Sequence, residues 1–314
     1  MGNSAIRGYC IQCKQRTRSL NPKGEWFCAN CNLRLEDKLT AKQSKVLDLV
    51  DSAGLSPSEL AIVLRQRGQG TSDIRTYDHS RTGHVKIGII SDTHIGHKKF
   101  DEGFMKYAAE TFKKEGIKDV YHSGDICEGM SGRPGHVYEL QYVGFSQQVG
   151  AAARIFKQYF KDFNLYGITG NHDDWFKMKS DIGANVGEEL QHRVPNFKYL
   201  GENEALIKLG PKTTLMLFHP GDGTAYATSY KMQKLVESLE GGSKPNVLVE
   251  GHYHKAMYMF NRNIHTLEAG TLCGQTGWMR GKKIPAHKGF WILEMNLNKR
   301  GITKFSPHFF PAYD

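Results

Sequence analysis

Short apolar runs, each ending in polar residues, recur through the C-terminal three quarters of the chain. The run VKIGII at residues 85–90 is rich in β-branched residues and predicts a strand. The other predicted strands are VYHSG, FNLYGIT, TTLMLF, NVLVE, IHTLEAG and GFWILEMNL. Helical periodicity separates the early strands, in FMKYAAETFKKE and in the long stretch 139–163. This alternation predicts an α/β sheet whose polar residues meet at the carboxyl ends of the strands.

The N-terminal segment has a different pattern. Residues 1–40 hold few apolar positions, too few to fold around a hydrophobic core without a staple. Two Cys-x-x-Cys pairs, 14 residues apart, have the spacing of a four-thiolate zinc site. We therefore predict a zinc ribbon over residues 1–40 that binds one structural Zn²⁺; the alternative is two incidental thiol pairs. The predicted zinc ligands are Cys10, Cys13, Cys28 and Cys31.

Residues 41–68 show helical periodicity in two stretches separated by a break that contains Gly54. Ser56, Pro57 and Glu59 form a start signal for the second helix. The pair is similar to a helix-turn-helix, and a plain helical hairpin gives the same pattern. Arg65 and Arg67 end the second helix, where side chains could contact phosphate. We read residues 69–85, which are polar and rich in Gly, Ser and Thr, as a linker, and residues 86–314 as the catalytic domain.

Charge and length narrow the class of protein. The 314 residues suffice for one large domain and a small appendage. The formal net charge is +10, and residues 1–40 carry seven Lys or Arg against three acidic residues. This distribution favours a polyanionic partner. The N-terminus has no hydrophobic block typical of a secretory signal, and no apolar stretch is long enough to span a membrane, so we expect a soluble cytoplasmic protein.

Five polar clusters follow predicted strands in a fixed order: SDTHIG, SGDICEG, TGNHDD, LFHPGDG and VEGHYH. They offer carboxylate, amide oxygen and imidazole, which hard and borderline divalent metals prefer. A bridging carboxylate can hold two such ions roughly 3.5–4 Å apart. The clusters therefore predict a two-metal site, although isolated Asp, Asn and His usually only cap strands. The predicted ligands are Asp92, His94, Asp125, Asn171, His219, His252 and His254.

The order of these motifs, Asp-x-His, Gly-Asp, Gly-Asn-His-Asp, His and Gly-His-x-His, resembles the calcineurin-like metallophosphoesterase superfamily over about residues 86–295. The resemblance implies a sandwich of two β-sheets flanked by helices. It also implies a bridging Asp125 between two ions, with Mn²⁺ expected first and Fe, Zn or Ni as alternatives. One ion would be held by Asp92, His94, Asp125 and His254, and the other by Asp125, Asn171, His219 and His252. His172 matches the family's histidine that is not a ligand and would act on the leaving oxygen.

The sequence indicates the substrate less clearly than the metal site. The protein phosphatase branch supplies arginines in its Gly-Asp and Gly-Asn-His motifs, and this chain has none there, which favours a diester over a monoester. The chain resembles the DNA-repair exonuclease branch in SDTHIG and GNHDD. After the ligands, Trp278 lies among basic residues, where it could stack on a base; the alternative is a solvated basic loop with one buried tryptophan. The candidate residues of this segment are Trp278, Arg280, Lys282 and Lys283.

These observations predict a two-metal phosphoesterase that hydrolyses nucleic acid, DNA rather than RNA, as a nuclease. The alternative enzyme is a phosphatase or phosphodiesterase for small phosphorylated molecules. The alternative from another class is a nucleic-acid-binding or assembly subunit in which the phosphoesterase fold is catalytically silent. The sequence leaves the oligomeric state open.

Overall fold

The computed structural model describes residues 8–10, 16–17, 76–178, 184–240, 242 and 244–313. The chain divides into two units, residues 1–73 and residues 74–314. In the first unit, β1 (Gly8–Tyr9) and β2 (Arg16–Thr17) pair antiparallel, and the buried Cys10 follows β1. Several predicted features lie outside the described residues: Cys13, Cys28, Cys31, the helices of residues 41–68, Arg65 and Arg67.

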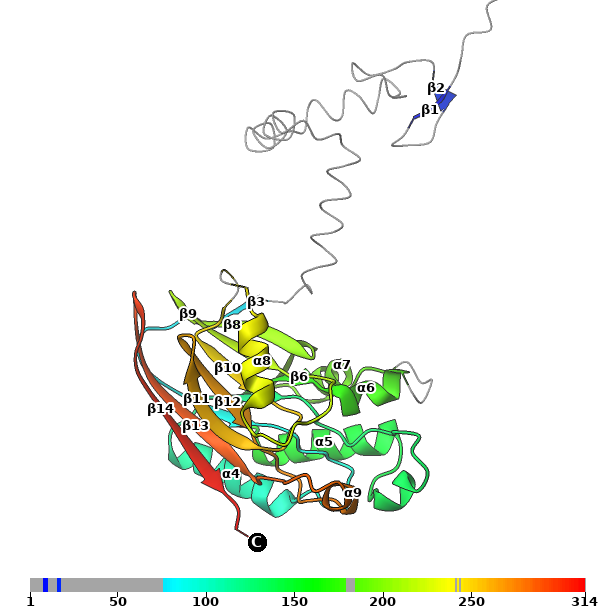
Figure 1. The fold of residues 1–314 in the computed structure, drawn as a ribbon. Helices are drawn as coiled ribbons and strands as arrows, with labels where there is room; N and C mark the ends of the chain where they lie inside the picture. Colours follow the sequence, from blue (N-terminus) through cyan, green and yellow to red (C-terminus); the bar gives the residue numbers. More distant parts are fainter. Residues whose placement is uncertain are drawn as a thin grey trace, which may run out of the picture. The chain divides into compact units, whose positions relative to one another are not determined.

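The second unit is built on two six-stranded sheets (Figure 1). The first, here called the β4 sheet, has the spatial order β14 (Gly301–Pro311), β13 (Gly289–Asn298), β4 (Gly83–Ile90), β5 (Asp119–Ser123), β6 (Asn164–Thr169) and β7 (Phe197–Glu202). The second, the β10 sheet, has the order β11 (Ala256–Asn261), β12 (Ile264–Ala269), β10 (Val247–Glu250), β9 (Thr213–Phe218), β8 (Glu204–Gly210) and β3 (Thr76–Asp78). Both sheets are mixed, with parallel strands at their centres.

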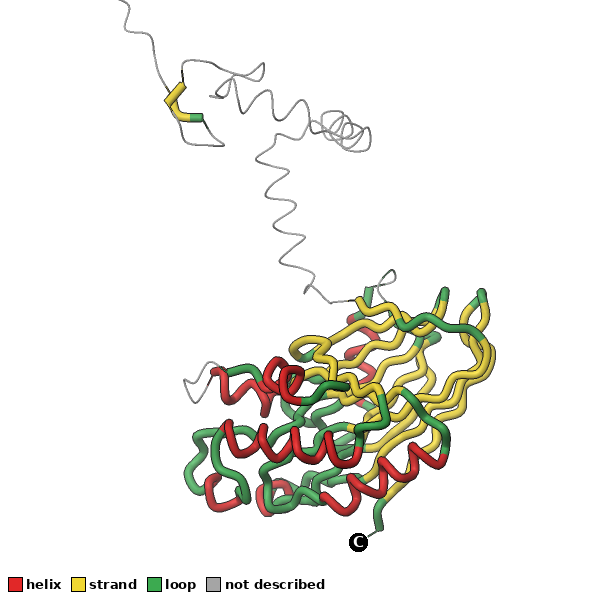
Figure 2. Tube along the Cα trace, turned by 180° about the vertical axis from the view of Figure 1, so that it is seen from behind, coloured by secondary structure: helices red, strands yellow, loops and turns green. Residues whose placement is uncertain are grey.

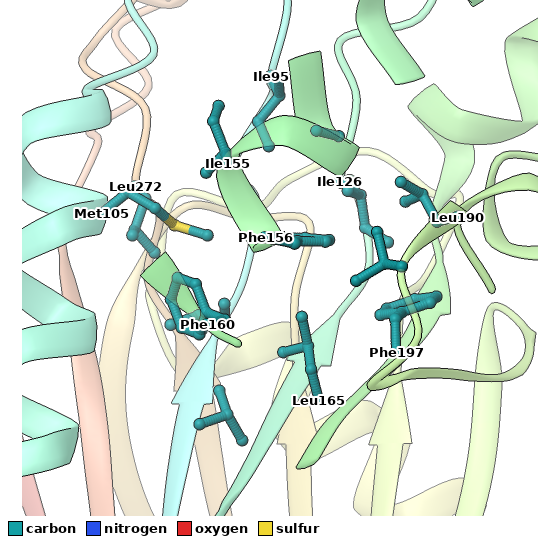
Figure 3. Close-up of a cluster of buried hydrophobic side chains, with 14 of the residues drawn as sticks. Ile95, Met105, Ile126, Ile155, Phe156, Phe160, Leu165, Leu190, Phe197 and Leu272 are labelled. Atoms are coloured by element: carbon teal, nitrogen blue, oxygen red, sulfur yellow. The ribbon is translucent and has the colours of Figure 1, made fainter. Parts of the chain in front are cut away.

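Three apolar layers hold the unit together. Between the two sheets, alternate side chains of one sheet pack against those of the other. Ile87, Leu217 and Val249 belong to this layer. A second cluster lies between the β4 sheet and the helices α4 (Glu102–Lys114), α5 (Phe145–Tyr159) and α7 (Val186–Arg193). Figure 3 shows part of this cluster, with Phe156 of α5 among side chains of the sheet and of α7. The helix α8 (Tyr230–Ser238) covers the outer face of the β10 sheet.

The remaining helical elements are short and lie at loops: η1 (His136–Glu139), α6 (Asn171–Met178) and α9 (Gly277–Gly281). Figure 2 shows α4, α5, α6 and α7 gathered on one side of the strands. This arrangement confirms the predicted two sheets flanked by helices. Within the described part of the chain, no helix has both the length and the apolar character that crossing a membrane requires.

All seven predicted strands are present, but the predicted helix over residues 139–163 is wrong at its start. The helix α5 begins only at Phe145, because Gly144 has a φ of 81°, a conformation that ends a right-handed helix. The residues before it belong to η1 and an irregular turn. The segment expected to be a linker contributes β3, which pairs in parallel with β8. Part of it therefore belongs to the sheet that supports the candidate site.

Two buried carboxyl groups lie side by side on the outer face of the β10 sheet. Glu250 and Glu268 are paired in register on the parallel strands β10 and β12, and both are about 1% exposed. Neither side-chain oxygen of Glu268 has a hydrogen-bond partner among the described residues. Burial raises the pKa of Glu268 from 4.5 to about 7. Burial, and then the neighbouring Glu268, raise the pKa of Glu250 to about 8.

We predict that Glu268→Gln stabilises the protein at pH 8 and not at pH 4.5. The folded state favours the protonated form of Glu268. Protonation of this group therefore contributes fully to the free energy of unfolding below pH 4.5, and this contribution is lost as the pH rises to about 7. The amide has no charge to bury at pH 8. Thermal unfolding should show a rise of roughly 2–4 °C for each kcal/mol gained. The exposed Glu240→Gln is the control, and an equal gain at both pH values would contradict the prediction.

Candidate metal centre

The five polar clusters meet at one place. Asp92, His94 and His254 offer ligand atoms that all lie within 4.8 Å of one another, and a second group of this kind contains Asp125, His219 and His252. Asp92 follows β4, Asp125 follows β5, His219 follows β9, and His252 and His254 follow β10. The seventh predicted ligand, Asn171, begins α6, and its Oδ1 lies 3.3 Å from His219 Nε2. The structure thus brings all seven residues together. Neighbouring parallel strands place their carboxyl ends, and the residues that follow them, at the same edge of a sheet.

Two observations link the groups. The Nε2 atom of His94 lies 3.8 Å from Asp125 Oδ2, so the two groups adjoin at Asp125. The Nε2 atom of His219 lies 3.1 Å from the same carboxylate. Asp125 therefore occupies the central position that a bridging ligand needs.

The backbone at these residues is unusual. Asp92, His94, Asp125, His252 and His254 all have φ between 47° and 81°, in the left-handed region. Only nine described residues other than glycine have positive φ, so these five form the majority. Side chains rarely adopt this conformation, and it persists where the surrounding structure fixes it. Here it turns each side chain from the end of its strand toward the common centre.

Glycines beside the ligands leave room for this approach. A Cβ atom on Gly170 would lie 2.4 Å from Asp125 Oδ1 and 2.6 Å from His219 Nε2. A Cβ atom on Gly124 would lie 2.3 Å from His219 Nδ1. The glycines of the Gly-Asp and Gly-Asn motifs are thus needed because ligand side chains pack directly against their backbone.

Hydrogen bonds fix which ring nitrogen faces the centre in three of the four candidate histidine ligands. The Nδ1 atoms of His94 and His219 lie 2.8 Å from Glu128 Oε2 and 2.7 Å from the Ser123 carbonyl oxygen. Because these oxygens only accept, each Nδ1 donates, and Nε2 is the nitrogen that faces the centre and would offer a lone pair to an ion when the ring is neutral. In His252 the roles of the two nitrogens are exchanged: Nε2 donates to the Asp222 carbonyl oxygen at 2.6 Å, which leaves Nδ1 for the centre. Such outer hydrogen bonds orient histidine ligands at metal sites.

The donor set therefore fits divalent cations. His94 Nε2 lies 2.9 Å from His254 Nε2 and 3.9 Å from Asp92 Oδ1, so three ligand-type atoms converge. The Nδ1 atom of His254 is buried without a hydrogen-bond partner among the described residues. Burial raises the pKa of Asp125, but His219 and His172 outweigh burial and hold it well below its usual range. The central carboxylate is therefore ionised and available as a ligand.

Glu128 is a site residue that the sequence reasoning missed. Its buried carboxylate lies 2.8 Å from His94 Nδ1 and 2.8 Å from His136 Nε2, and 3.6 Å from His172 Nδ1. Burial raises its pKa, but His172 and His136 outweigh burial and hold it well below the usual range. The signal was an acidic residue three positions after Asp125, in SGDICEG. Glu128 connects a candidate ligand, the candidate catalytic histidine and the loop that carries His136.

His172 is held by its neighbours. Its ring lies between Trp175, with centroids 3.8 Å apart, and the edge of His94, at 4.5 Å. Its Nδ1 donates to the Glu128 carbonyl oxygen at 2.8 Å, which leaves Nε2 as the atom that can exchange a proton. Burial lowers the pKa of His172, but Asp125 and Glu128 outweigh it and raise the pKa to about 9.

A cavity of about 680 Å³ opens above the centre. Its lining includes Asp125, His172, His254, Arg133 and Trp278. This volume is within the range of about 300–1,000 Å³ that is usual for ligand sites. A substrate that fills the cavity would contact both the candidate metal ligands and His172.

Comparison with known proteins agrees with this geometry. The family model described as "Calcineurin-like phosphoesterase superfamily domain" matches residues 85–285. The chain belongs to this superfamily. The match starts at β4 and includes every candidate ligand.

Curated relatives of this calcineurin-like phosphoesterase are named "DNA polymerase II small subunit". The relative from Methanothermobacter thermautotrophicus is 25% identical over 262 residues, which cover 69% of this chain and 53% of that protein. The relative from Halobacterium salinarum is 30% identical over 321 residues, covering 85% of this chain and 61% of that protein. The chain thus spans between about half and three fifths of the length of these relatives. The repair-exonuclease branch remains a prediction.

A solved structure titled as a novel archaeal phosphodiesterase is also similar to this calcineurin-like phosphoesterase. It is 16% identical, covers 72% of this chain and 100% of its own, and has a TM-score of 0.41.

The predicted nucleic-acid residues of the phosphoesterase domain are only partly brought to the cavity. Trp278, on α9, lines the cavity and is 47% exposed. Arg280, Lys282 and Lys283 are exposed but are not among the cavity-lining residues. The alternative prediction, in which Trp278 is buried within a solvated basic loop, is therefore wrong, because Trp278 is not buried. The lining also includes Arg133, whose guanidinium pairs with Glu139 at 2.7 Å.

We predict that Glu128→Ala weakens Mn²⁺ binding by about 10- to 100-fold, because His94 loses the acceptor that orients its ring. Isothermal titration of the metal-stripped protein with Mn²⁺ measures the effect. The matched control is Glu110→Ala, an exposed residue on α4. Unchanged affinity in a folded Glu128→Ala protein would show that His94 needs no such support.

Proposed function

We propose that this protein is a two-metal phosphodiesterase that cleaves nucleic acid, with DNA as its substrate. The observation that carries the proposal is the pair of adjoining His and carboxylate groups, four of whose members, His94, Asp125, His252 and His254, line the cavity. One ion would be held by Asp92, His94, Asp125 and His254, and the other by Asp125, Asn171, His219 and His252. When bound, two such ions activate water and neutralise charge on phosphoryl oxygens.

His172 is the proposed catalytic residue. It lines the cavity next to the candidate ligands and is not part of either group that contains Asp92 or Asp125. Its Nδ1 is committed to the Glu128 carbonyl oxygen, so the ring can present a proton at Nε2 to the leaving oxygen. The ring contacts with Trp175 and His94 keep it in this orientation.

The choice of nucleic acid has separate support. The chain has a net charge of +10, which favours a polyanionic partner. Trp278 presents a half-exposed ring at the cavity, where an unpaired base could stack. Arg133 is the cavity-lining arginine, but its charge is paired with Glu139, so the site offers a phosphate monoester little additional positive charge.

A second candidate function rests on the curated relatives. Both are named as the small subunit of DNA polymerase II, so this chain could serve as a subunit of a DNA-synthesising assembly with or without its own hydrolytic activity. The intact set of candidate ligands favours activity. In either case DNA is the partner.

We predict that the protein cleaves labelled DNA in the presence of Mn²⁺ and that His172→Ala lowers kcat by about 10²- to 10⁴-fold without loss of DNA binding. His192→Ala, on the exposed side of α7, is the matched control. Gel assays should compare single-stranded DNA, duplex DNA and RNA. Hydrolysis of bis-p-nitrophenyl phosphate should be followed by absorbance. Turnover of the small diester alone would indicate the small-molecule alternative, and DNA binding without any cleavage would indicate the silent subunit.

For the N-terminal unit we propose a zinc ribbon that holds DNA. Cys28→Ser should release zinc and weaken DNA binding while turnover of the small diester stays nearly unchanged, because zinc binding folds such small units. Elemental analysis and fluorescence anisotropy measure the two effects. Undiminished DNA affinity after zinc loss would assign DNA binding to the phosphoesterase domain instead.

A further inference from the structure

Two oppositely charged side chains in the lining of the cavity, Arg133 and Glu139, are paired with each other. The Arg133 guanidinium donates to Glu139 Oε2 at 2.7 Å. The two side chains are 39% and 31% exposed, so both can be reached by a molecule in the cavity. Among the described residues that line the cavity, Arg133 is the only arginine or lysine. A phosphate group can therefore bind this guanidinium only in competition with Glu139.

The loop that carries this pair is fixed to the candidate metal centre. Glu128 Oε2 accepts from His94 Nδ1, and Oε1 of the same carboxylate lies 2.8 Å from His136 Nε2. His136 begins η1, the short helix that ends with Glu139. The His136 N–H donates to the Arg133 carbonyl oxygen at 3.0 Å. One carboxylate thus connects a candidate metal ligand to the loop that holds both members of the ion pair.

The segment before α4 holds Glu139 in position. The Lys98 N–H donates to the Glu139 carbonyl oxygen at 2.9 Å. His97 Nδ1 accepts from the Lys99 N–H at 2.8 Å, so Nε2 carries the proton of the ring. This Nε2 lies 3.6 Å from Glu139 Oε2 and is buried without a hydrogen-bond partner among the described residues. Its partial positive charge favours an ionised Glu139 at this place.

The two classes of phosphate ester differ in charge. A diester carries one negative charge, whereas a monoester carries about −1.5 to −2 at pH 7, because its second pKa is about 6. An unpaired arginine binds such a group with two parallel hydrogen bonds. The neutral pair of Arg133 and Glu139 gives the second charge of a monoester no such gain, and the carboxylate repels it. The pair therefore disfavours a monoester more than a diester.

We propose that Glu139 is a specificity-determining residue, which keeps the site selective for diesters by neutralising Arg133. The inference rests on the proposed two-metal hydrolysis and adds its selectivity. Hydrolysis of a diester breaks one P–O bond: the hydroxyl of water joins phosphorus, and the other proton of water goes to the leaving oxygen. The new monoester loses a further proton to solvent above about pH 6. The ion pair gives this dianion little hold, so the product leaves with its phosphate attached.

Removing the charge of Glu139 tests the proposal. Glu139→Gln should raise kcat/KM for p-nitrophenyl phosphate, a monoester, by about tenfold or more, because Arg133 is then free to bind phosphate. The value for bis-p-nitrophenyl phosphate should change less. When this diester is limiting, the wild type should release one of its nitrophenol groups and the variant both. Combining Arg133→Gln with Glu139→Gln should abolish the gain, since neither charge is left.

Glu189→Gln is the matched control. Glu189 pairs with Arg193 on α7 at the same distance of 2.7 Å, and the two side chains are similarly exposed, at 34% and 38%. Neither residue lines the cavity. This substitution should leave the ratio of monoester to diester turnover as it is in the wild type. Unchanged monoester turnover in a folded Glu139→Gln protein, or a gain that survives in the double variant, overturns the proposal.

Binding of inorganic phosphate separates this inference from the proposed function, because it needs no turnover. Isothermal titration of the Mn²⁺-loaded protein at pH 8, where most phosphate is dianionic, should show binding about tenfold or more tighter in Glu139→Gln than in the wild type. If the wild type hydrolyses neither ester, the proposed function fails. Tighter phosphate binding by the variant would then still support the role of Glu139, and equal binding would refute it.

Discussion

The constraint on which the structure depends is the burial of several charged groups at one point. Asp92 and Asp125 are 0% and 1% exposed, and they lie among histidines that are almost as deeply buried. Unpaired charges in such a place would cost several kcal/mol each. They are tolerated because each has fixed partners: Asp92 accepts from the His252 N–H at 2.9 Å, and Asp125 from the His172 N–H at 2.8 Å. The same bonds tie together loops that follow different strands.

The surrounding fold makes this arrangement rigid. Asp173, beside the candidate catalytic histidine, accepts from the backbone N–H groups of Ile126, Cys127 and Gly170, and so connects the loops after β5 and β6. The apolar layers on both faces of the β4 sheet hold those loops in place. The left-handed conformations at five candidate ligands persist where the packed strands before them and the loop hydrogen bonds fix the backbone. The candidate ligands are thus held by hydrogen bonds between their loops and by the packed strands that precede them.

The two sheets contribute differently. The β4 sheet supplies Asp92 and Asp125 and supports His172, whereas the β10 sheet supplies the histidines that follow β9 and β10. Membership of the calcineurin-like phosphoesterase superfamily accounts for a centre that both sheets share. Outside the centre, the β10 sheet also carries the buried pair of Glu250 and Glu268, and β11 forms one of its edges. These features belong to the scaffold and are not needed to gather the ligands.

The central strands and the candidate ligands could be predicted from the sequence, because a short β-branched run such as VKIGII favours a strand and the polar cluster after it then lies at the end of that strand. The strands β8 and β14 were not predicted, because Lys208 and Lys304 interrupt their apolar runs and Pro307 argues against a strand except at an edge. The strand β11 was missed although its run AMYMF is apolar. Glu128 was missed because a lone acidic residue has no pattern. Its contacts, the orientation of the histidine rings and the left-handed backbone could not be predicted, since each depends on atoms that are distant in sequence and meet only when both sheets have packed.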